Sequence, residues 1–303
     1  MVIDKKTTLA GLAGLGTLGA LVALTYKVKP RDADETLEAQ INRTLSEERE
    51  QIRPSVADIN TFSWITRDNN PIHRLTKLAQ QFGFADIPLM GAHTAAYGEQ
   101  YIEGVVQKMR DFWGADIKII GQETKFKNPL YPEERVLWKV TESKKNNGTI
   151  DIEVKGAVKD KEIVAITSRL GTEYPLMPQI AGPIYSRRYL FEQSHLDAFY
   201  DCVGGKRSEK VPNMLPAAFV PATLLRLLED KTRTMEGVNW SMDFNFIAQA
   251  VPGPLQVDIF APRPPSIRNS NSIYKFRTVV SQNSKPITYG EIISATPQKI
   301  NFD

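Results

Sequence analysis

The spacing of apolar and polar residues downstream of Arg53 changes from helical to strand-like, and it does so twice. In the first half, a helix signal that opens at Ser55 and a run of small and apolar residues after Pro88 precede four β-rich segments. In the second half, a helix signal at Ser194 and a similar run after Pro212 precede four more. The expected strands are 117–126, 135–143, 149–158 and 162–170, then 238–248, 255–261, 272–281 and 287–295. Helices followed by successive antiparallel strands predict an α+β fold that contains the same unit twice.

The opening helices carry matching cap signals, but the segments after them differ between the two units. Ser55 with Asp58, and Ser194 with Asp197, can each cap a helix and place an acid near its positive end. The first unit is longer between its opening helix and its long helix. The additional stretch carries Asp68, Asn70, Pro71 and His73. One copy with a polar cluster and one without it predict a single working site, with the other copy adapted to another role.

The amino terminus has a different character. Residues 7–26 are uncharged and mostly apolar, with lysines on both sides, and about twenty such residues can cross a bilayer as a helix. We expect an N-terminal hydrophobic helix that anchors the chain (1–29), followed by a polar linker (30–54). The excess of Lys and Arg after the apolar run weakly predicts a cytosolic folded part. A cleaved signal peptide and a helix docked on the core are the alternatives.

Composition limits the chemistry. The net charge is +3 and no segment concentrates it, so nothing indicates nucleic-acid binding. The single cysteine excludes an intrachain disulfide and a thiolate zinc cluster, and no metal or cofactor is expected. Any histidine chemistry must use His73, His93 or His195. We expect His93 to be a polar packing residue and His195 to be exposed.

The segment from Phe62 to His73 contains the motif Asp68-Asn69-Asn70-Pro71-Ile72-His73, and Ile87-Pro88-Leu89-Met90-Gly91 comes after it. These residues closely resemble the hydratase motif of MaoC-like (R)-specific enoyl-CoA hydratases. The resemblance covers residues 55–175 well and the second unit in outline. It implies a double hot-dog fold, with two long helices each wrapped by an antiparallel sheet. The catalytic unit would be 55–177, and a non-catalytic unit, 178–303, would shape an acyl tunnel between the two.

The reaction that the resemblance implies also suits the residues themselves. Adding water to a double bond conjugated to a thioester needs a base for the water, a proton for the α-carbon and a stabiliser for the enolate oxygen. Pro71 disfavours helix at Asn70 but can begin one, which would put Asp68 in a loop and His73 on the first helical turn. In the resemblance, Asp68 and His73 form the catalytic dyad, and the Gly91 N–H polarises the thioester carbonyl. Asn70 and Glu99 are the expected substrate-binding residues.

Departures from the family pattern keep other functions open. Met90 precedes Gly91 where the family commonly has histidine, and Glu99 stands where a serine is frequent. A carboxylate on the long helix is what some hot-dog thioesterases use, so Glu99 supports an acyl thioesterase as an alternative, although it could equally pair with a nearby Lys or Arg. A non-catalytic acyl-thioester-binding partner subunit is the third hypothesis. The expected partner is an acyl-CoA or acyl-carrier thioester, and a homodimer is compatible with the resemblance.

Overall fold

The computed structural model describes residues 50–302, with gaps at 114–115, 147, 181, 205–206, 233–237, 264, 269–270, 297–299 and 301. The hydrophobic helix expected at 7–26 and most of the expected linker therefore lie outside the described residues. Within the described part of the chain, no helix is both long enough and apolar enough to cross a bilayer.

Each half of the chain folds in the order strand, helices, strands. The first half contains β1 (Glu50–Ile52), α3 (Val56–Thr66), the 3₁₀ turn η2 (Pro71–His73), α4 (Thr76–Gln81), α5 (Gly91–Trp113), β2 (Lys118–Phe126), β3 (Val136–Asn146), β4 (Thr149–Val158) and β5 (Lys161–Gly171). The second half contains β6 (Tyr185–Phe191), α6 (Gln193–Val203), α7 (Met214–Ala217), α8 (Phe219–Thr232), β7 (Val238–Phe246), β8 (Gly253–Ile259), β9 (Ser266–Arg268), β10 (Asn271–Gln282) and β11 (Lys285–Thr296). All eight expected strands form, and the short strands β1, β6 and β9 are additional.

The strands make one 11-stranded antiparallel sheet that is ordered symmetrically about its centre. The order is β1-β3-β4-β5-β2-β7-β11-β10-β8-β6, and β9 pairs with β10. Strands β2 and β7 pair at the middle, with Gly121 opposite Asn245. Outward from them, β5 corresponds to β11, β4 to β10, β3 to β8 and β1 to β6. This order agrees with the repeated pattern in the sequence, and it also shows that the two units share one continuous sheet.

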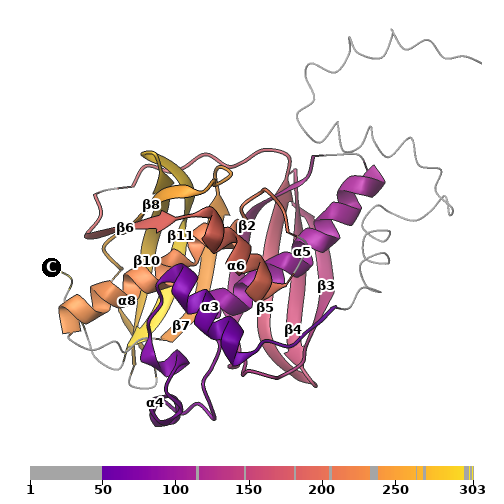
Figure 1. The fold of residues 1–303 in the computed structure, drawn as a ribbon. Coiled ribbons are helices and arrows are strands. Elements are labelled where there is room, and N and C mark those ends of the chain that lie inside the picture. The colour runs from indigo at the N-terminus through magenta and orange to yellow at the C-terminus, as the bar shows by residue number, and fades with distance from the viewer. Residues whose placement is uncertain are drawn as a thin grey trace, which may run out of the picture.

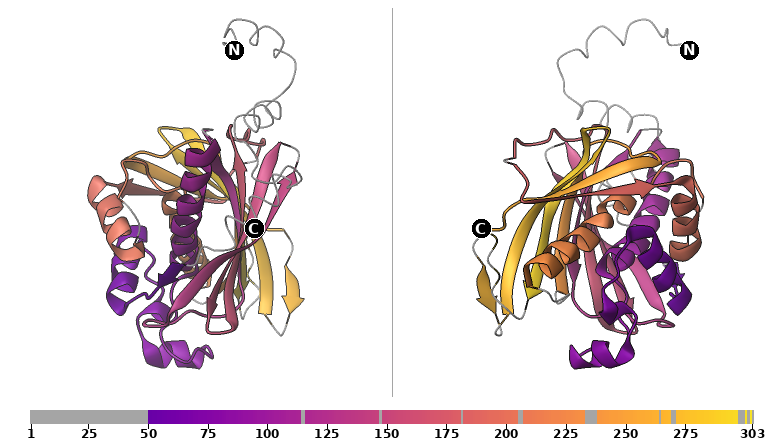
Figure 2. Two further views of the ribbon diagram at one scale, coloured as in Figure 1. Left: turned by 90° about the vertical axis from the view of Figure 1, so that its right-hand side faces the viewer. Right: turned by 60° about the vertical axis from the view of Figure 1, so that its left-hand side comes forward.

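The helices cover one face of this sheet. Figures 1 and 2 show α5 and α8 crossing the sheet, with α3 and α6 lying further out. The small residues of α5 allow the sheet to pack closely on the helix. A Cβ atom at Gly98 would overlap the end of the Ile166 side chain and lie 3.1 Å from the Trp138 ring, so a larger residue there would force the Ile166 side chain to move.

The second long helix is interrupted, which corrects the expectation of two equivalent long helices. Helix α5 has 23 residues, whereas the corresponding segment consists of the four-residue α7 and the 14-residue α8, separated at Ala218. Proline has no backbone N–H, so Pro221 cannot donate to the carbonyl of Ala217, and the helical ladder breaks there.

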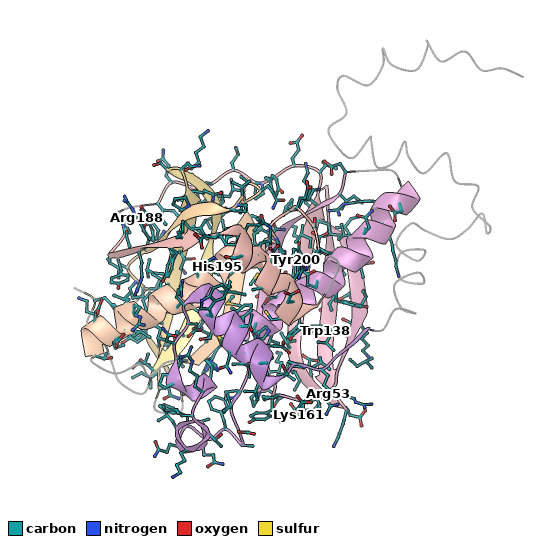
Figure 3. The ribbon with its side chains drawn as sticks, in the orientation of Figure 1. Arg53, Trp138, Lys161, Arg188, His195 and Tyr200 are labelled. Atoms are coloured by element: carbon teal, nitrogen blue, oxygen red, sulfur yellow. The ribbon has the colours of Figure 1, made fainter. Side chains whose placement is uncertain are left out.

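The opening helix of the second unit also differs from the prediction. Ser55 and Asp58 form the expected capping box on α3, but α6 begins earlier than expected, with Glu192 rather than Ser194 as its N-cap. The Glu192 N–H donates to His195 Nδ1 over 3.0 Å. His195 is only 2% exposed, so the expectation of an exposed histidine is wrong. Its ring stacks on Trp64 of α3 at 4.6 Å, because α3 packs against α6. Figure 3 labels His195 on the ribbon.

Candidate active site

The segment Asp68–His73 is a rigid turn between two short elements. Helix α3 ends at Arg67, whose φ of 60° reverses the chain. Asp68 Oδ1 accepts the Asn70 N–H over 3.1 Å, and Asn70 Oδ1 accepts the Ile72 N–H over 3.2 Å. Pro71 then opens the 3₁₀ turn that carries His73. Asp68 thus lies in the loop and His73 on the first helical turn, which is the local geometry that the Asn-Pro spacing predicts.

Two residues that the sequence analysis did not single out hold this turn in place. The Ser63 hydroxyl of α3 donates to the Asp68 carbonyl, and the Arg74 guanidinium donates to Ser63 Oγ over 2.6 Å. Arg74 also donates to Asn69 Oδ1 over 3.0 Å. Ser63 lies five residues before Asp68 on a helix, so its role depends on how the chain reverses at Arg67, which no motif shows.

His73 is held in one tautomer. Its Nδ1 lies 2.8 Å from the carbonyl oxygen of Pro88. A carbonyl oxygen can only accept, so Nδ1 carries the proton and Nε2 is the basic nitrogen. Burial lowers the pKa of His73 below its usual 6.5, although the charge of Asp68 and the Pro88 carbonyl act in the opposite direction. At neutral pH the ring is therefore an uncharged imidazole with a free basic nitrogen.

Asp68, Asn70, His73 and Gly91 all line one cavity of about 740 Å³. The rest of its wall comes from both halves of the chain. The first unit also contributes Ile72, Phe84, Pro88, Leu89, Ala92, Thr94, Lys125, Phe126, Lys127, Asn128, Pro129 and Leu130, and the second contributes Pro221, Leu224, Leu225, Leu228, Asn239, Trp240, Ser241, Ile293 and Ser294. The polar residues of the motif and apolar residues of α8 thus line the same cavity, which both units build.

Gly91 begins helix α5 at the edge of this cavity. The first N–H groups of a helix have no acceptor within it and lie at its positive end, so they suit a carbonyl oxygen or an oxyanion. A Cβ atom at this position would lie 2.9 Å from Cζ of Phe126, which also lines the cavity. Glycine is therefore the residue that lets the Phe126 ring close over the helix start.

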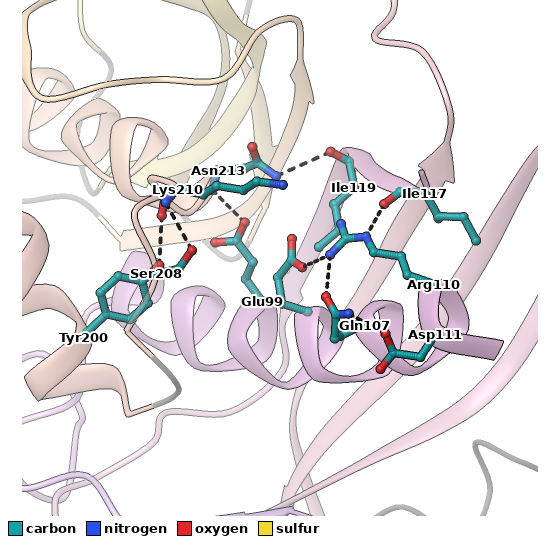
Figure 4. Close-up of polar contacts among 11 residues, drawn as sticks. Glu99, Gln107, Arg110, Asp111, Ile117, Ile119, Tyr200, Ser208, Lys210 and Asn213 are labelled. Carbon is teal, nitrogen blue, oxygen red and sulfur yellow. Dashed lines mark hydrogen bonds and ion pairs between the residues drawn. The ribbon is translucent and has the colours of Figure 1, made fainter. Parts of the chain in front are cut away.

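The structure separates Glu99 from the other four expected site residues. It lies eight residues after Gly91, about 12 Å along the helix, and it does not line the cavity. Its carboxyl group is completely buried, and one of its oxygens accepts the Asn213 N–H over 2.8 Å (Figure 4). The other oxygen accepts the Met214 N–H over 2.9 Å. Burial raises the pKa of Glu99 to about 8, against the effect of these two donors. Glu99 was expected either to contact the substrate or to pair with a Lys or Arg side chain. In the structure it does neither, since it lies outside the cavity lining and its described partners are backbone N–H groups.

His93 packs as expected. It is completely buried, outside the cavity lining, with its ring stacked on Phe62 at 4.3 Å and on Tyr97 at 4.8 Å. Burial lowers the pKa of His93 to about 3, so it stays uncharged. Among the described residues, no group of three or more His, Cys, Asp or Glu side chains is arranged to hold a metal ion.

The second unit supplies polar cavity residues that the sequence analysis missed. Ser294 is 1% exposed and its Oγ has no hydrogen-bond partner among the described residues. Ser241 and Asn239 line the same cavity. They meet where the pairing of β7 and β11 shifts register between Ile293 and Ser294. The sequence predicts the strands that carry these residues but not their position at the cavity, because a register shift between distant strands cannot be recognised from local sequence.

Comparison with known proteins agrees with this architecture. Residues 29–165 match the model of the MaoC like domain. A MaoC-like dehydratase from Phytophthora capsici is 11% identical, with a TM-score of 0.55, and the match covers 84% of this chain and 97% of that one. The peroxisomal multifunctional enzyme type 2 from Drosophila melanogaster is 14% identical, with a TM-score of 0.53, and the match covers 85% of this chain and 51% of that one.

A Mycobacterium tuberculosis protein described as having a double hotdog fold is 9% identical, with a TM-score of 0.56, over 84% of this chain and 97% of that one. No curated protein sequence matches the chain. At these identities the structural matches establish the fold alone. The chain therefore has a double hot-dog fold, and its residues 29–165 are similar to the MaoC like domain.

Proposed function

We propose that this protein is a hydro-lyase that adds water to a trans-2-enoyl thioester, or removes it from the (R)-3-hydroxyacyl thioester. The observation that carries the proposal is that Asp68, His73 and the start of α5 at Gly91 face one cavity with an apolar wall. The MaoC-like domain supports a hydratase or dehydratase reaction in general terms. The acyl thioester and the roles of the individual residues are our own inference.

In the hydration direction, Asp68 and His73 hold one water molecule beside C3 of the substrate. The Nε2 atom of His73 is unprotonated and accepts a proton as the water oxygen bonds to C3. The C2=C3 electron pair moves toward the thioester carbonyl, whose oxygen gains negative charge. The N–H of Gly91 stabilises that oxygen, and His73 Nε2 then returns the proton to C2 of the enolate, which completes the addition of water and restores the neutral imidazole. The same groups serve dehydration in reverse.

The second unit shapes the space for the acyl chain. Leu224, Leu225 and Leu228 of α8 present an apolar surface to the cavity, opposite the polar turn of the first unit. The second unit carries no copy of the dyad, because residues 204–213 between its opening helix and α7 include neither aspartate nor histidine. The carrier of the thioester, CoA or an acyl-carrier protein, would lie outside the cavity.

The alternatives predict different outcomes in the same assay. An acyl thioesterase that uses Glu99 would need this carboxyl group beside the thioester, whereas it contacts Asn213 and Met214 instead. A non-catalytic acyl-binding subunit would use the same cavity without turnover. The geometry of Asp68 and His73 therefore favours the hydro-lyase over both.

The test is a spectrophotometric assay with crotonyl-CoA and longer trans-2-enoyl-CoA substrates, with analysis of product chirality. We expect formation of the (R)-3-hydroxyacyl product and a loss of roughly 10²–10⁴-fold in kcat for His73→Ala. His195→Phe is the matched control, because His195 packs between the helices and does not line the cavity. Thioester cleavage that survives Asp68→Asn but is abolished by Glu99→Gln would instead establish the thioesterase. Binding of acyl-CoA without any turnover would establish the acyl-binding subunit.

A further inference from the structure

The symmetry of the sheet assigns each feature of the cavity a counterpart in the other unit. The cavity lies between the start of α5 in the first unit and α8 and β7 in the second. Its counterpart must lie between the start of α7 in the second unit and α5 and β2 in the first. Both helical segments begin shortly after a proline, Pro88 or Pro212. The two locations can therefore be compared residue by residue.

At the counterpart location, the chain itself fills the space. Asn213 and Met214, the N-cap and the first residue of α7, align with Leu89 and Met90 directly before α5, and they donate their N–H groups to Glu99 of α5 over 2.8 and 2.9 Å. The Asn213 side chain also donates to the Ile119 carbonyl of β2 over 3.4 Å (Figure 4). When the units are aligned on Pro88 and Pro212, Glu99 corresponds to Thr223, the neighbour of the cavity-lining Leu224.

The strands beside the two locations match as well. The pairing of β2 with β5 shifts register between Ile119 and Gly121, and that of β7 with β11 shifts at the corresponding place. The shift in the second unit borders the cavity through Asn239 and Ser241. The shift in the first unit borders the Asn213 contact. Both locations thus combine the start of a helical segment with a register shift in the neighbouring strand. They differ in whether a side chain from the other unit contacts the helix start.

We propose that Glu99 is a built-in occupant that closes the second unit's counterpart of the cavity. Its carboxyl group accepts backbone N–H groups at the start of α7, in the place that a substrate carbonyl would take at the start of α5. In the working site, the corresponding space in front of Gly91 stays open because α8 presents leucines rather than a carboxyl group. This inference rests on the duplicated fold and the Glu99 contacts, and it stands whether or not the proposed reaction is correct.

The energetics explain why a carboxyl group is kept in so buried a place. Glu99 is 0% exposed, and among the described residues it forms no ion pair. Its polar partners are backbone N–H groups, and Met214 is also 0% exposed. If the carboxyl group were removed, at least one buried N–H would lose its acceptor, which is costly in a protein interior. Glu99 and the start of α7 therefore satisfy one another across the boundary between the units.

The decisive experiment is chemical rescue of Glu99→Ala in the full chain by acetate. Acetate has the same heavy atoms that the truncation removes, so it fits the space that the variant opens. We expect Glu99→Ala to lower Tm by roughly 5–15 °C, and about 100 mM sodium acetate to restore several degrees relative to the same concentration of sodium chloride. Glu103→Ala, one turn further along α5, is the matched control, since Glu103 is partly exposed and pairs with Arg110. Its Tm should not respond to acetate.

A second variant covers the case in which Glu99→Ala does not fold. Glu99→Gln keeps the shape but offers one acceptor oxygen instead of two. We expect amide hydrogen exchange at Asn213 or Met214 to become about tenfold faster in this variant or more, and to stay unchanged in Glu103→Ala. Acetate that stabilises all variants equally, or none of them, would overturn the proposal, and so would exchange rates that match the wild type. None of these measurements depends on catalytic activity.

Discussion

The two halves of this molecule share one architecture, and they treat the start of their central helical segments in opposite ways. In the first unit, the start of α5 at Gly91 opens onto a cavity, with Asp68 and His73 beside it. In the second, Asn213 and Met214 meet the buried carboxyl group of Glu99. The difference teaches that the two units have related helix starts, and that the side chains packed against each start decide whether it opens onto a cavity.

The largest difference between the units should appear when the same change is made in each. Asp68 follows the opening helix of the first unit, and Asp201 lies near the end of that of the second, where it pairs with Arg207 on the surface. We expect Asp68→Asn to lower kcat/KM for crotonyl-CoA by roughly 10²–10⁴-fold, because the dyad loses its carboxylate. Asp201→Asn should leave turnover unchanged. Equal effects of the two substitutions on kcat/KM would contradict our proposal that only the first unit is catalytic.

The buried Glu99 carboxyl group at the start of α7 should make the stability of the protein depend on pH. The pKa of Glu99 is raised to about 8 in the folded state, so between pH 5 and 8 the folded protein binds a proton there that the unfolded chain releases. Stability from this group is therefore present at low pH and lost as pH rises toward 8, by roughly 2–4 kcal/mol. Glu99→Gln should remove this slope.

Denaturant unfolding of the wild type and Glu99→Gln across this pH range measures the effect as a difference curve. The difference curve is needed because His73 and His93 also make stability depend on pH. Burial lowers the pKa of both, so their contribution to the stability of the folded protein decreases as pH falls below their usual 6.5. Their contribution is common to both proteins and cancels. Parallel curves for the two proteins would show that Glu99 does not titrate in this window.

The open unit should be sensitive to a single methyl group. In Gly91→Ala, the new Cβ would lie 2.9 Å from Phe126 Cζ and force that ring toward the space of the substrate. We expect kcat/KM to fall by about 10–100-fold, since a small displacement at the reacting centre is costly. Adding Phe126→Leu should recover part of the loss, because a smaller side chain relieves the overlap. If the second change brought no recovery, the overlap would not be the cause.

Much of the fold could be predicted from the sequence because its signals are local. Alternating apolar residues identify all eight long strands, and the small residues after Pro88 identify α5. The edge strand β6 was missed because Arg187 and Arg188 interrupt its apolar positions. The pairing of β2 with β7 and the burial of His195 depend on contacts between the units, which local spacing does not determine.

The candidate site divides in the same way. The turn from Asp68 to His73 was predictable because its hydrogen bonds join residues that are close in the sequence. The position of Glu99 was not, since its partners lie more than one hundred residues away. The α8 residues of the cavity wall were not predictable for the same reason, because contacts between distant segments bring them to the site. Side chains positioned by their own segment were thus predictable, and side chains positioned by the other unit were not.

The smallest effect concerns the wall that the second unit builds. Leu225 lies on α8, lines the cavity and is 6% exposed, so a larger side chain there would shorten the apolar space without touching the dyad. We expect Leu225→Trp to raise KM for long trans-2-enoyl-CoA substrates by up to about tenfold, with a smaller effect on crotonyl-CoA, since one or two lost methylene contacts are worth about 1–2 kcal/mol. The ratio of kcat/KM between chain lengths is the measurement. A uniform loss across chain lengths would indicate that the acyl chain runs elsewhere, and the second unit would then contribute only the half of the sheet that supports the first.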